Sequence, residues 1–274
     1  MQKGTPEAAA DLMIASLSDS TVKQYNVSYK LWWFFCQNKN LDPHLNSTIL
    51  VVDFLTEQFN KGASYSTLNT HRSALSLLLG NRIGADEDIK RLLKGAFKLR
   101  TPKPKYNCTW DPQMVLNLIS QWHPNQELSL KNLTKKLVIL LALCTAHRVQ
   151  TLSLIKMENL QVSDQGIHIV ISDIIKTSAP GRDQPLLYLP FFNEQQNICP
   201  ATTLQDYLSV TRNIRSNNLN HLILTHKKPH KAATSQTISR WIKEVLSESG
   251  IDTSFFSAHS TRHAAESAAA SAGA

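Results

Sequence analysis

The sequence predicts a mainly α-helical protein with one small β-hairpin or meander, an α+β chain of two domains. Apolar residues recur at helical spacing along most of its 274 residues. They alternate with a period of two around residues 166–190, as in short strands. An extended segment rich in proline and lysine near residue 100 separates two helical regions, and each region is long enough to bury its own core.

The N-terminal region is predicted to be helical. In residues 21–40, Thr21 and Gln24 form a T-x-x-Q capping box ahead of a stretch rich in Tyr, Trp and Phe, which favours a buried helix. Two more helices are predicted over residues 66–79 and 87–100. Their apolar faces are Leu68, Leu75, Leu78 and Leu79 in the first and Ile89, Leu92, Leu93 and Phe97 in the second.

A basic surface is predicted on the second of these helices and on the segment that follows it, because no acidic residue lies between Ile89 and Trp110. Its candidate DNA contacts are Lys90, Arg91, Lys94, Lys98, Arg100, Lys103 and Lys105. A solvated lysine face is the alternative interpretation. The TPKPK stretch cannot continue a helix, so residues 101–108 are predicted to be a basic linker between domain 1–100 and domain 109–274.

The C-terminal region combines helices with two short strands. A strongly apolar helix is predicted around residues 133–144, at the centre of a core. Strands are expected at 166–172 and 185–190, with SAPGR supplying turn residues between them. Further helices are expected at 202–214, at 235–250 and in the segment that begins at His259.

Composition and charge favour a polyanionic partner. The net charge is +8 and the pI is about 9.3, and nucleic acid is the commonest polyanion inside a cell. Four scattered cysteines without a C-x-x-C pair are typical of reduced thiols and predict neither a disulfide framework nor a metal site. The sequence shows no signal peptide or membrane-spanning segment, so we expect a soluble intracellular protein without cofactors.

Four basic residues stand out as a candidate catalytic set: Arg148, Lys176, His259 and Arg262. Arg148 follows the apolar helix, and Lys176 lies beside the predicted hairpin. His259 and Arg262 are three residues apart, so on a helix they share a face and can approach one phosphate. Two arginines can stabilise a developing oxyanion with paired N–H donors and without a metal. Taken singly, each of these residues is more often a surface, capping or structural group.

The order of these residues behind a helical basic region resembles the tyrosine recombinase (phage-integrase-like) superfamily. The strings ALCTAHRVQTLSLI, IIKTSAPGRDQPLLYLP and SGIDTSFFSAHSTRHAAESAAA look like its eukaryotic transposon branch, the Crypton and DIRS-type recombinases. The resemblance runs from about residue 20 to the end of the chain. It implies a helical core-binding (SAM-like) domain over residues 1–100, a mixed catalytic domain over 109–274, and double-stranded DNA as the partner.

The resemblance also implies the roles of the four residues. Arg148 and Arg262 would hold the scissile phosphate, Lys176 would protonate the leaving 5′-oxygen, and His259 would assist proton transfer. A tyrosine would form a 3′-phosphotyrosyl link, which splits one difficult step into two. Family members act as synaptic tetramers, and the resemblance places the protein in the nucleus.

Several positions depart from the family pattern. Ala146 stands where the wider family usually has glycine, Thr151 stands where it often has an acid, and the bulky His263 is expected to crowd the phosphate pocket. The nucleophilic tyrosine should follow the H-x-x-R motif, yet all six tyrosines precede His259. We therefore expect a chain truncated at its C-terminus that binds DNA without cleaving it.

Two rival functions stand beside an incomplete recombinase. The first is a domesticated, non-catalytic DNA-binding module. The second treats His259 and His263 as metal ligands, which is disfavoured because H-S-T-R-H lacks the glutamate of H-E-x-x-H and Arg262 would repel a cation.

Overall fold

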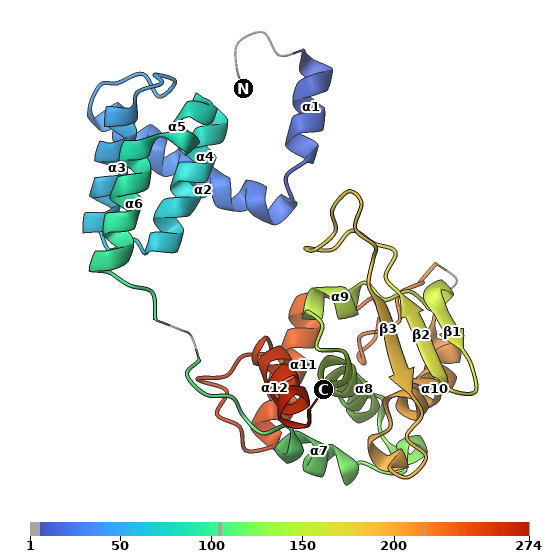
Figure 1. Ribbon diagram of the computed structural model, residues 1–274. Coiled ribbons are helices and arrows are strands. Elements are labelled where there is room, and N and C mark those ends of the chain that lie inside the picture. Colours follow the sequence, from blue (N-terminus) through green and yellow to red (C-terminus); the bar gives the residue numbers. More distant parts are fainter. Residues whose placement is uncertain (1–5, 104–105, 217, 274) are drawn as a thin grey trace. The chain divides into compact units, whose positions relative to one another are not determined.

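A computed structural model describes residues 6–103, 106–216 and 218–273 (Figure 1). The chain divides into two compact units, Met1–Lys105 and Tyr106–Ala274, and this division falls inside the segment predicted as a linker. The described residues are mainly helical with one small antiparallel sheet, which confirms the predicted fold class.

The first unit consists of helices in its described part. They are α1 (Glu7–Ala15), α2 (Asp19–Asn38), α3 (Thr48–Asn60), α4 (Tyr65–Leu79), α5 (Asn81–Ala85) and α6 (Glu87–Leu99). Phe54 lies at the centre of the core, with ring centroids 5.4 Å from both Trp32 and Phe35 and 5.6 Å from His71. Edge-to-face contacts of this kind stabilise a core beyond simple burial.

The start of α2 corrects the predicted capping box. The Oγ of Ser18 accepts a hydrogen bond from the backbone N–H of Thr21 at 3.2 Å, so Ser18 is the N-cap and the helix begins before Thr21. Serine is among the preferred N-cap residues, and here it precedes the competing threonine. The helix is also less buried than its composition suggests, because Trp33 and Phe34 are exposed.

The second unit surrounds one apolar helix. Its helices are α7 (Pro112–Ser120), α8 (Leu130–Thr145), α9 (Val149–Ser153), α10 (Pro200–Thr211), α11 (Ser235–Glu248) and α12 (Ser260–Ser271). Every residue of α8 from Leu133 to Ala142 is buried, and α10, α11 and α12 all pack against it (Figure 1). A helix that is buried all round is the centre of a core, as the sequence predicted.

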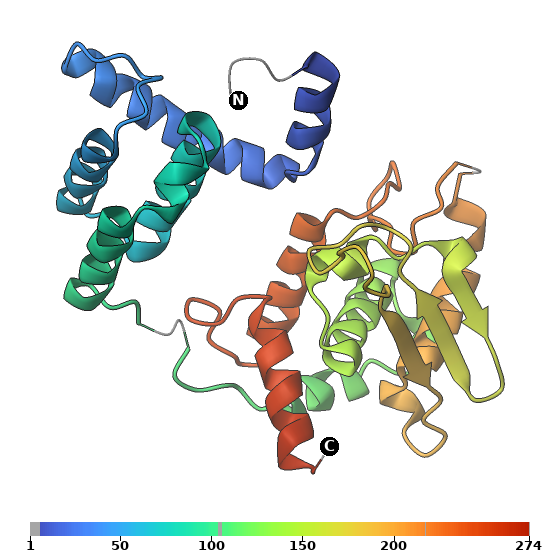
Figure 2. The same cartoon turned by 45° about the horizontal axis from the view of Figure 1, so that its top comes forward.

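The sheet has three antiparallel strands in the order β1 (Leu160–Val162), β2 (Gly166–Val170) and β3 (Leu186–Pro190). Ile167 pairs with Leu189 and Ile169 with Leu187, and these four side chains form its buried face. In Figure 2 the sheet lies at one side of the helices, and β3 packs against α8 and α10. The strands at β2 and β3 were predicted and β1 was not. Residues 171–185 form a long loop between β2 and β3 where a shorter turn was expected.

Candidate active site

The end of α8 places the first arginine. Ala146 adopts the left-handed conformation, with φ 50°, and terminates the helix. This conformation is the one that glycine adopts without cost, so Ala146 occupies a position that favours glycine. The ring of His147 bonds the carbonyl oxygen of Thr145 at 2.7 Å and stabilises the turn. Arg148 follows as the extended N-cap residue of α9, and its side chain is half-buried.

The start of α12 places the second arginine. Ser260 is buried, and its Oγ accepts a hydrogen bond from the indole N–H of Trp110 at 2.9 Å. The hydroxyl of the buried Thr261 donates to the carbonyl of Ala258 at 2.8 Å. These bonds fix the first turn of α12, so that Arg262 projects from an anchored helix.

Arg148 and Arg262 line one cavity of about 380 Å³. The residues that share its wall are Thr145, Ala146, His147, Thr151, Ile175, Thr177, Asp183, Pro185 and Glu266. Two guanidinium groups in a hollow of this size can give several N–H donors to the non-bridging oxygens of one phosphate. The structure thus brings together the two arginines that were predicted to share a phosphate.

Two carboxylates balance the arginines in this cavity. The Nε of Arg262 donates to Oε1 of Glu266 at 2.7 Å, and Asp183 contributes the second acid. Thr151 is buried and presents a neutral side chain to the cavity. Sequence reasoning missed Glu266 and Asp183. Glu266 could have been found from its i,i+4 spacing to Arg262, whereas Asp183 lies in the long loop between β2 and β3 and shows no such pattern.

The other two predicted residues lie outside the cavity wall. Lys176 is exposed on a turn, and its neighbours Ile175 and Thr177 line the cavity on either side of it. His259 is exposed at the N-cap of α12, and its ring centroid lies 5.8 Å from that of His263. The structure therefore places Lys176 between two cavity-lining residues of the loop, without placing its own side chain in the cavity wall.

The expected crowding by His263 is not found among the described residues. His263 is exposed and does not line the cavity. Its ring contacts that of Tyr106, with centroids 6.2 Å apart, and the Tyr106 hydroxyl shares a hydrogen bond with the Oγ of Ser257 at 2.7 Å. These rings pack beside the start of α12, away from the cavity wall.

The basic residues predicted to contact DNA in the first unit differ in their surroundings. Lys90 and Lys94 line a hollow of about 460 Å³ together with Arg72, whose Nε is buried without a hydrogen-bond partner. Lys90 also pairs with Glu87 at 2.8 Å. Arg91, Lys98 and Lys103 are exposed, and Lys105 lies outside the described residues.

Arg100 has a structural role in addition to any contact with DNA. Its guanidinium donates to the carbonyl of Ala63 at 2.8 Å and to that of Phe59 at 3.3 Å. It also lies 4.2 Å from the centroid of the Phe59 ring, a cation–π contact. These bonds tie the end of α6 to the end of α3.

Two further observations concern metal ions and membranes in the part of the chain that the structure describes. No group of three or more His, Cys, Asp or Glu side chains gathers there at a spacing that could hold a metal ion. In the same residues, no helix combines the length and apolar character that crossing a bilayer requires.

The second unit thus combines helices, one small antiparallel sheet and a cavity lined by two arginines. Residues 113–274 match the Phage integrase family. This match covers more than half of the chain, and the chain belongs to that family.

Solved structures of recombinases are similar over most of the chain. A lambda integrase dimer bound to a COC′ core site is 17% identical with a TM-score of 0.52, over 93% of this chain and 85% of that one. XerH recombinase bound to its difH substrate is 16% identical with a TM-score of 0.61, over 89% and 67%. The Tn1549 transposon integrase in complex with transposon right end DNA is 18% identical with a TM-score of 0.52, over 83% and 74%. At these identities the likeness shows the fold. No curated protein sequence matches the chain.

Proposed function

We propose that this chain binds duplex DNA and holds one backbone phosphate between Arg148 and Arg262. The observation that carries the proposal is that these two arginines, far apart in sequence, line one cavity. The net charge of +8 and the DNA-bound recombinases among the similar structures support it. Most of the affinity would come from phosphate contacts, which release counterions from the duplex.

The chemistry proposed for a complete site assigns each residue one task. A tyrosine oxygen attacks the phosphorus and forms a 3′-phosphotyrosine, while the P–O bond to the 5′-oxygen breaks and that oxygen takes a proton from Lys176. Arg148 and Arg262 stabilise the charge that builds on the non-bridging oxygens, and His259 assists proton transfer. The place of Lys176 between two cavity-lining residues is consistent with this task.

The nucleophile is the missing part of this chemistry. All six tyrosines precede His259 in the sequence, and each lies in the described part of the chain, where none lines the two-arginine cavity. We therefore propose that this chain binds DNA without cleaving it. Tyr106 approaches the start of α12, but its hydroxyl bonds Ser257 and its ring packs on Phe255 and Phe256.

We further propose that the protein belongs to the Crypton and DIRS-type branch of the family and that its target is nuclear DNA. A tetramer is the proposed assembly, in which a tyrosine supplied by another protein segment would act. The quoted strings around Arg148, Lys176 and Arg262 support the branch. The lambda integrase tetramer bound to a Holliday junction, 16% identical with a TM-score of 0.52, supports the assembly. A domesticated DNA-binding module is the second candidate, and the net charge of +8 supports duplex binding by such a module as well.

A nicked duplex tests the proposal. Fluorescence anisotropy across a salt series should show binding that weakens steeply as salt rises. On a denaturing gel, the chain alone should form no covalent adduct with the nicked strand. Binding that barely changes with salt would contradict the DNA-binding proposal, and an adduct stable in denaturant would contradict the missing nucleophile.

A chimera separates the two candidates. Fusing a relative's C-terminal segment, with its tyrosine, after residue 273 should restore adduct formation if the arginine cavity is still competent. Arg148→Ala and Arg262→Ala should then abolish the adduct while lowering general duplex affinity only slightly. A chimera that binds DNA but forms no adduct would support the domesticated module.

A further inference from the structure

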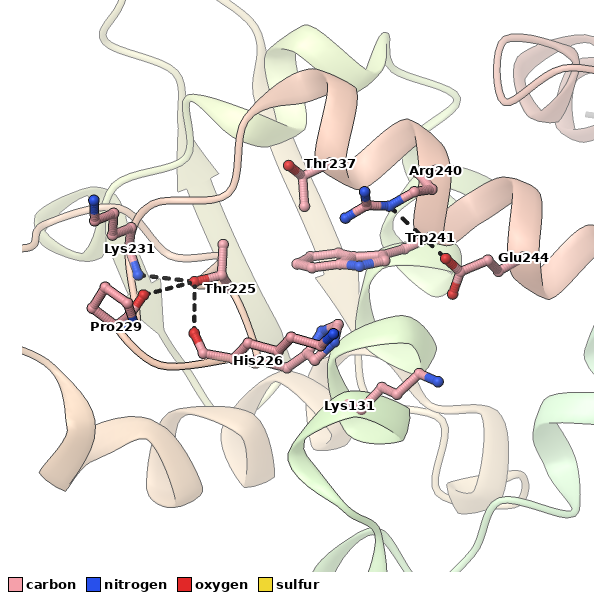
Figure 3. Close-up of a pocket in the computed structure, with 10 residues that line it drawn as sticks. Lys131, Thr225, His226, Pro229, Lys231, Thr237, Arg240, Trp241 and Glu244 are labelled. Atoms are coloured by element: carbon pink, nitrogen blue, oxygen red, sulfur yellow. Dashed lines mark hydrogen bonds and ion pairs between the residues drawn. The ribbon is translucent and has the colours of Figure 1, made fainter.

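A second basic hollow lies in the second unit, outside the two-arginine cavity. It has a volume of about 640 Å³ and shares no lining residue with that cavity. Figure 3 shows it between the loop 225–231, the first turns of α8 and one face of α11. Its residues are Lys131, Thr225, His226, Lys227, Pro229, Lys231, Thr237, Arg240, Trp241 and Glu244.

The loop at the rim of this hollow is held by its own hydrogen bonds. The backbone N–H of Thr225 donates to the carbonyl of Lys231 at 2.8 Å. The N–H of Lys231 donates to the Thr225 hydroxyl at 3.0 Å (Figure 3). The His230 ring bonds the Thr225 carbonyl at 2.8 Å. These bonds hold the loop in one conformation. Lys227 and Lys231 therefore project from a preorganised loop, and binding a ligand requires little further ordering of it.

The charges of the hollow do not cancel. Glu244 is its single acid, and its Oε2 is already bonded to the Nζ of Lys135 at 2.8 Å, while its Oε1 lies 3.9 Å from the Nε of Arg240. Within the described residues, no carboxylate forms an ion pair with Lys131, Lys227 or Lys231. Three lysines and Arg240 thus face a single carboxylate in this concave space, and the excess of positive charge attracts anions.

The pKa of His226 is lowered by burial and partly by the positive charges of this hollow. Its ring packs against that of Trp241, with centroids 5.2 Å apart, and its Nδ1 is buried without a hydrogen-bond partner. Burial lowers the pKa of His226, and the charges of Lys131 and Lys227 lower it further, against an opposing effect of Glu244. This shift favours the neutral imidazole, and the lysines and Arg240 carry the positive charge of the hollow.

We propose that this hollow is a phosphate-binding site separate from the two-arginine cavity. The inference rests on the proposed function, because the DNA backbone is the phosphate source that the protein would meet there. Lysine ammonium groups bind phosphate as point charges and need no fixed approach direction, which suits a backbone contact that carries no sequence information. Free phosphate is the alternative source of the same chemistry.

A pair of matched double variants tests the site. Lys227→Gln with Lys231→Gln removes two rim charges, and Lys228→Gln with Lys243→Gln removes two exposed charges outside the hollow, one on the same loop and one on α11. Anisotropy of a labelled duplex across a salt series gives the slope of log K against log salt. The rim variant should flatten that slope by about 0.9 for each phosphate that the protein no longer neutralises, and the control should leave it unchanged.

A second arm identifies the source of the phosphate. Inorganic phosphate is titrated into ¹⁵N-labelled protein, and the amide shifts of Thr225 and Lys231 are followed. Amide shifts that saturate in the wild type and vanish in the rim variant indicate that the hollow binds free phosphate. If the rim variant changes the salt slope of duplex binding but the wild type shows no such shifts, the DNA backbone is the phosphate source. Equal slopes in both double variants together with no phosphate shifts would overturn the proposal. A wild-type chain that does not bind duplex would contradict the proposed function, while the phosphate titration would still test the hollow.

Discussion

The Nε of Arg262 donates to Oε1 of Glu266 across 2.7 Å, one turn further along α12 and inside the cavity that Arg148 also lines. The pair would have two opposite effects on the phosphate that we propose to bind there. It fixes the arginine side chain, because one donor has a permanent acceptor, and it places a negative charge beside the phosphate. The two effects can be separated by substitution.

Glu266→Gln should strengthen duplex binding by roughly two- to fivefold, because the amide oxygen can still accept from Arg262 while the negative charge is gone. Glu266→Ala should bind less tightly than Glu266→Gln, since Arg262 then loses its acceptor. Glu194→Gln is the control, because Glu194 is exposed and lies outside the cavity. Anisotropy at one low salt concentration measures all three, and equal affinities for Gln and Ala at position 266 would show that the hydrogen bond does not position Arg262.

The first unit allows a comparison of two predicted DNA contacts. Lys94→Ala should flatten the salt dependence of duplex binding by about 0.9 in slope, because Lys94 is exposed and forms no ion pair among the described residues. Arg100→Ala should instead lower the melting temperature, since its guanidinium bonds the carbonyls of Phe59 and Ala63.

The measurements for these two variants are a salt series and a thermal melt on each. If Arg100→Ala melts like the wild type and flattens the salt slope as much as Lys94→Ala does, Arg100 contacts DNA and the carbonyl bonds do not stabilise the unit. Lys61→Ala provides a surface control from the C-cap of α3, near the same end of the unit.

Ala146 stores backbone strain at the end of α8. An L-residue in the left-handed region costs about 1 kcal/mol, and glycine avoids this cost. Ala146→Gly should therefore raise the free energy of unfolding by about 1 kcal/mol in urea titration. Ala142→Gly, within the helix and fully buried, should lower it. A destabilised Ala146→Gly variant would show that the methyl group contributes packing that outweighs the strain.

Local patterns in the sequence predicted the elements that have strong periodicity. The apolar residues of α11 recur at helical spacing, and Ile238, Trp241 and Ile242 are all buried as expected. The strand β1 was missed because Leu160–Val162 is too short to show alternation. The capping prediction at Thr21 was wrong because Ser18, three residues earlier, offers an equally good acceptor.

The candidate site shows the limit of such reasoning more clearly. The chemistry of Arg148 and Arg262 could be inferred from residue type and order, but their meeting in one cavity depends on how α9 and α12 pack around α8. The basic hollow was missed for the same reason. Lys131 and Lys231 are distant in sequence, and no local pattern indicates that they meet.

Lys136 gives the second unit a pH-dependent stability that can be measured directly. Its side chain is fully buried on α8, where Nζ donates to the carbonyl of Trp122 and to Oδ1 of Asn125 at 2.8 Å. Burial lowers its pKa to about 8, with the charge of Asp206 opposing the shift. Below pH 8 both the folded and the unfolded chain carry the charge, so the full cost of burying it is present.

Between pH 8 and the ordinary lysine value near 10.5, the folded chain releases this proton while the unfolded chain retains it. The unfolded state then binds more protons, so the contribution of Lys136 to the free energy of unfolding rises with pH across this window, by at most about 1.4 kcal/mol per pH unit. Urea titrations at pH 7, 8, 9 and 10 give the free energies of unfolding of the wild type and of Lys136→Met. Above pH 8, the value for the wild type should increase relative to that for the variant. Lys243→Met, on the exposed side of α11, is measured in parallel to remove effects common to all lysines. A difference between wild type and Lys136→Met that stays constant from pH 7 to pH 10 would mean that the buried amine keeps its proton throughout, held by its two oxygen acceptors.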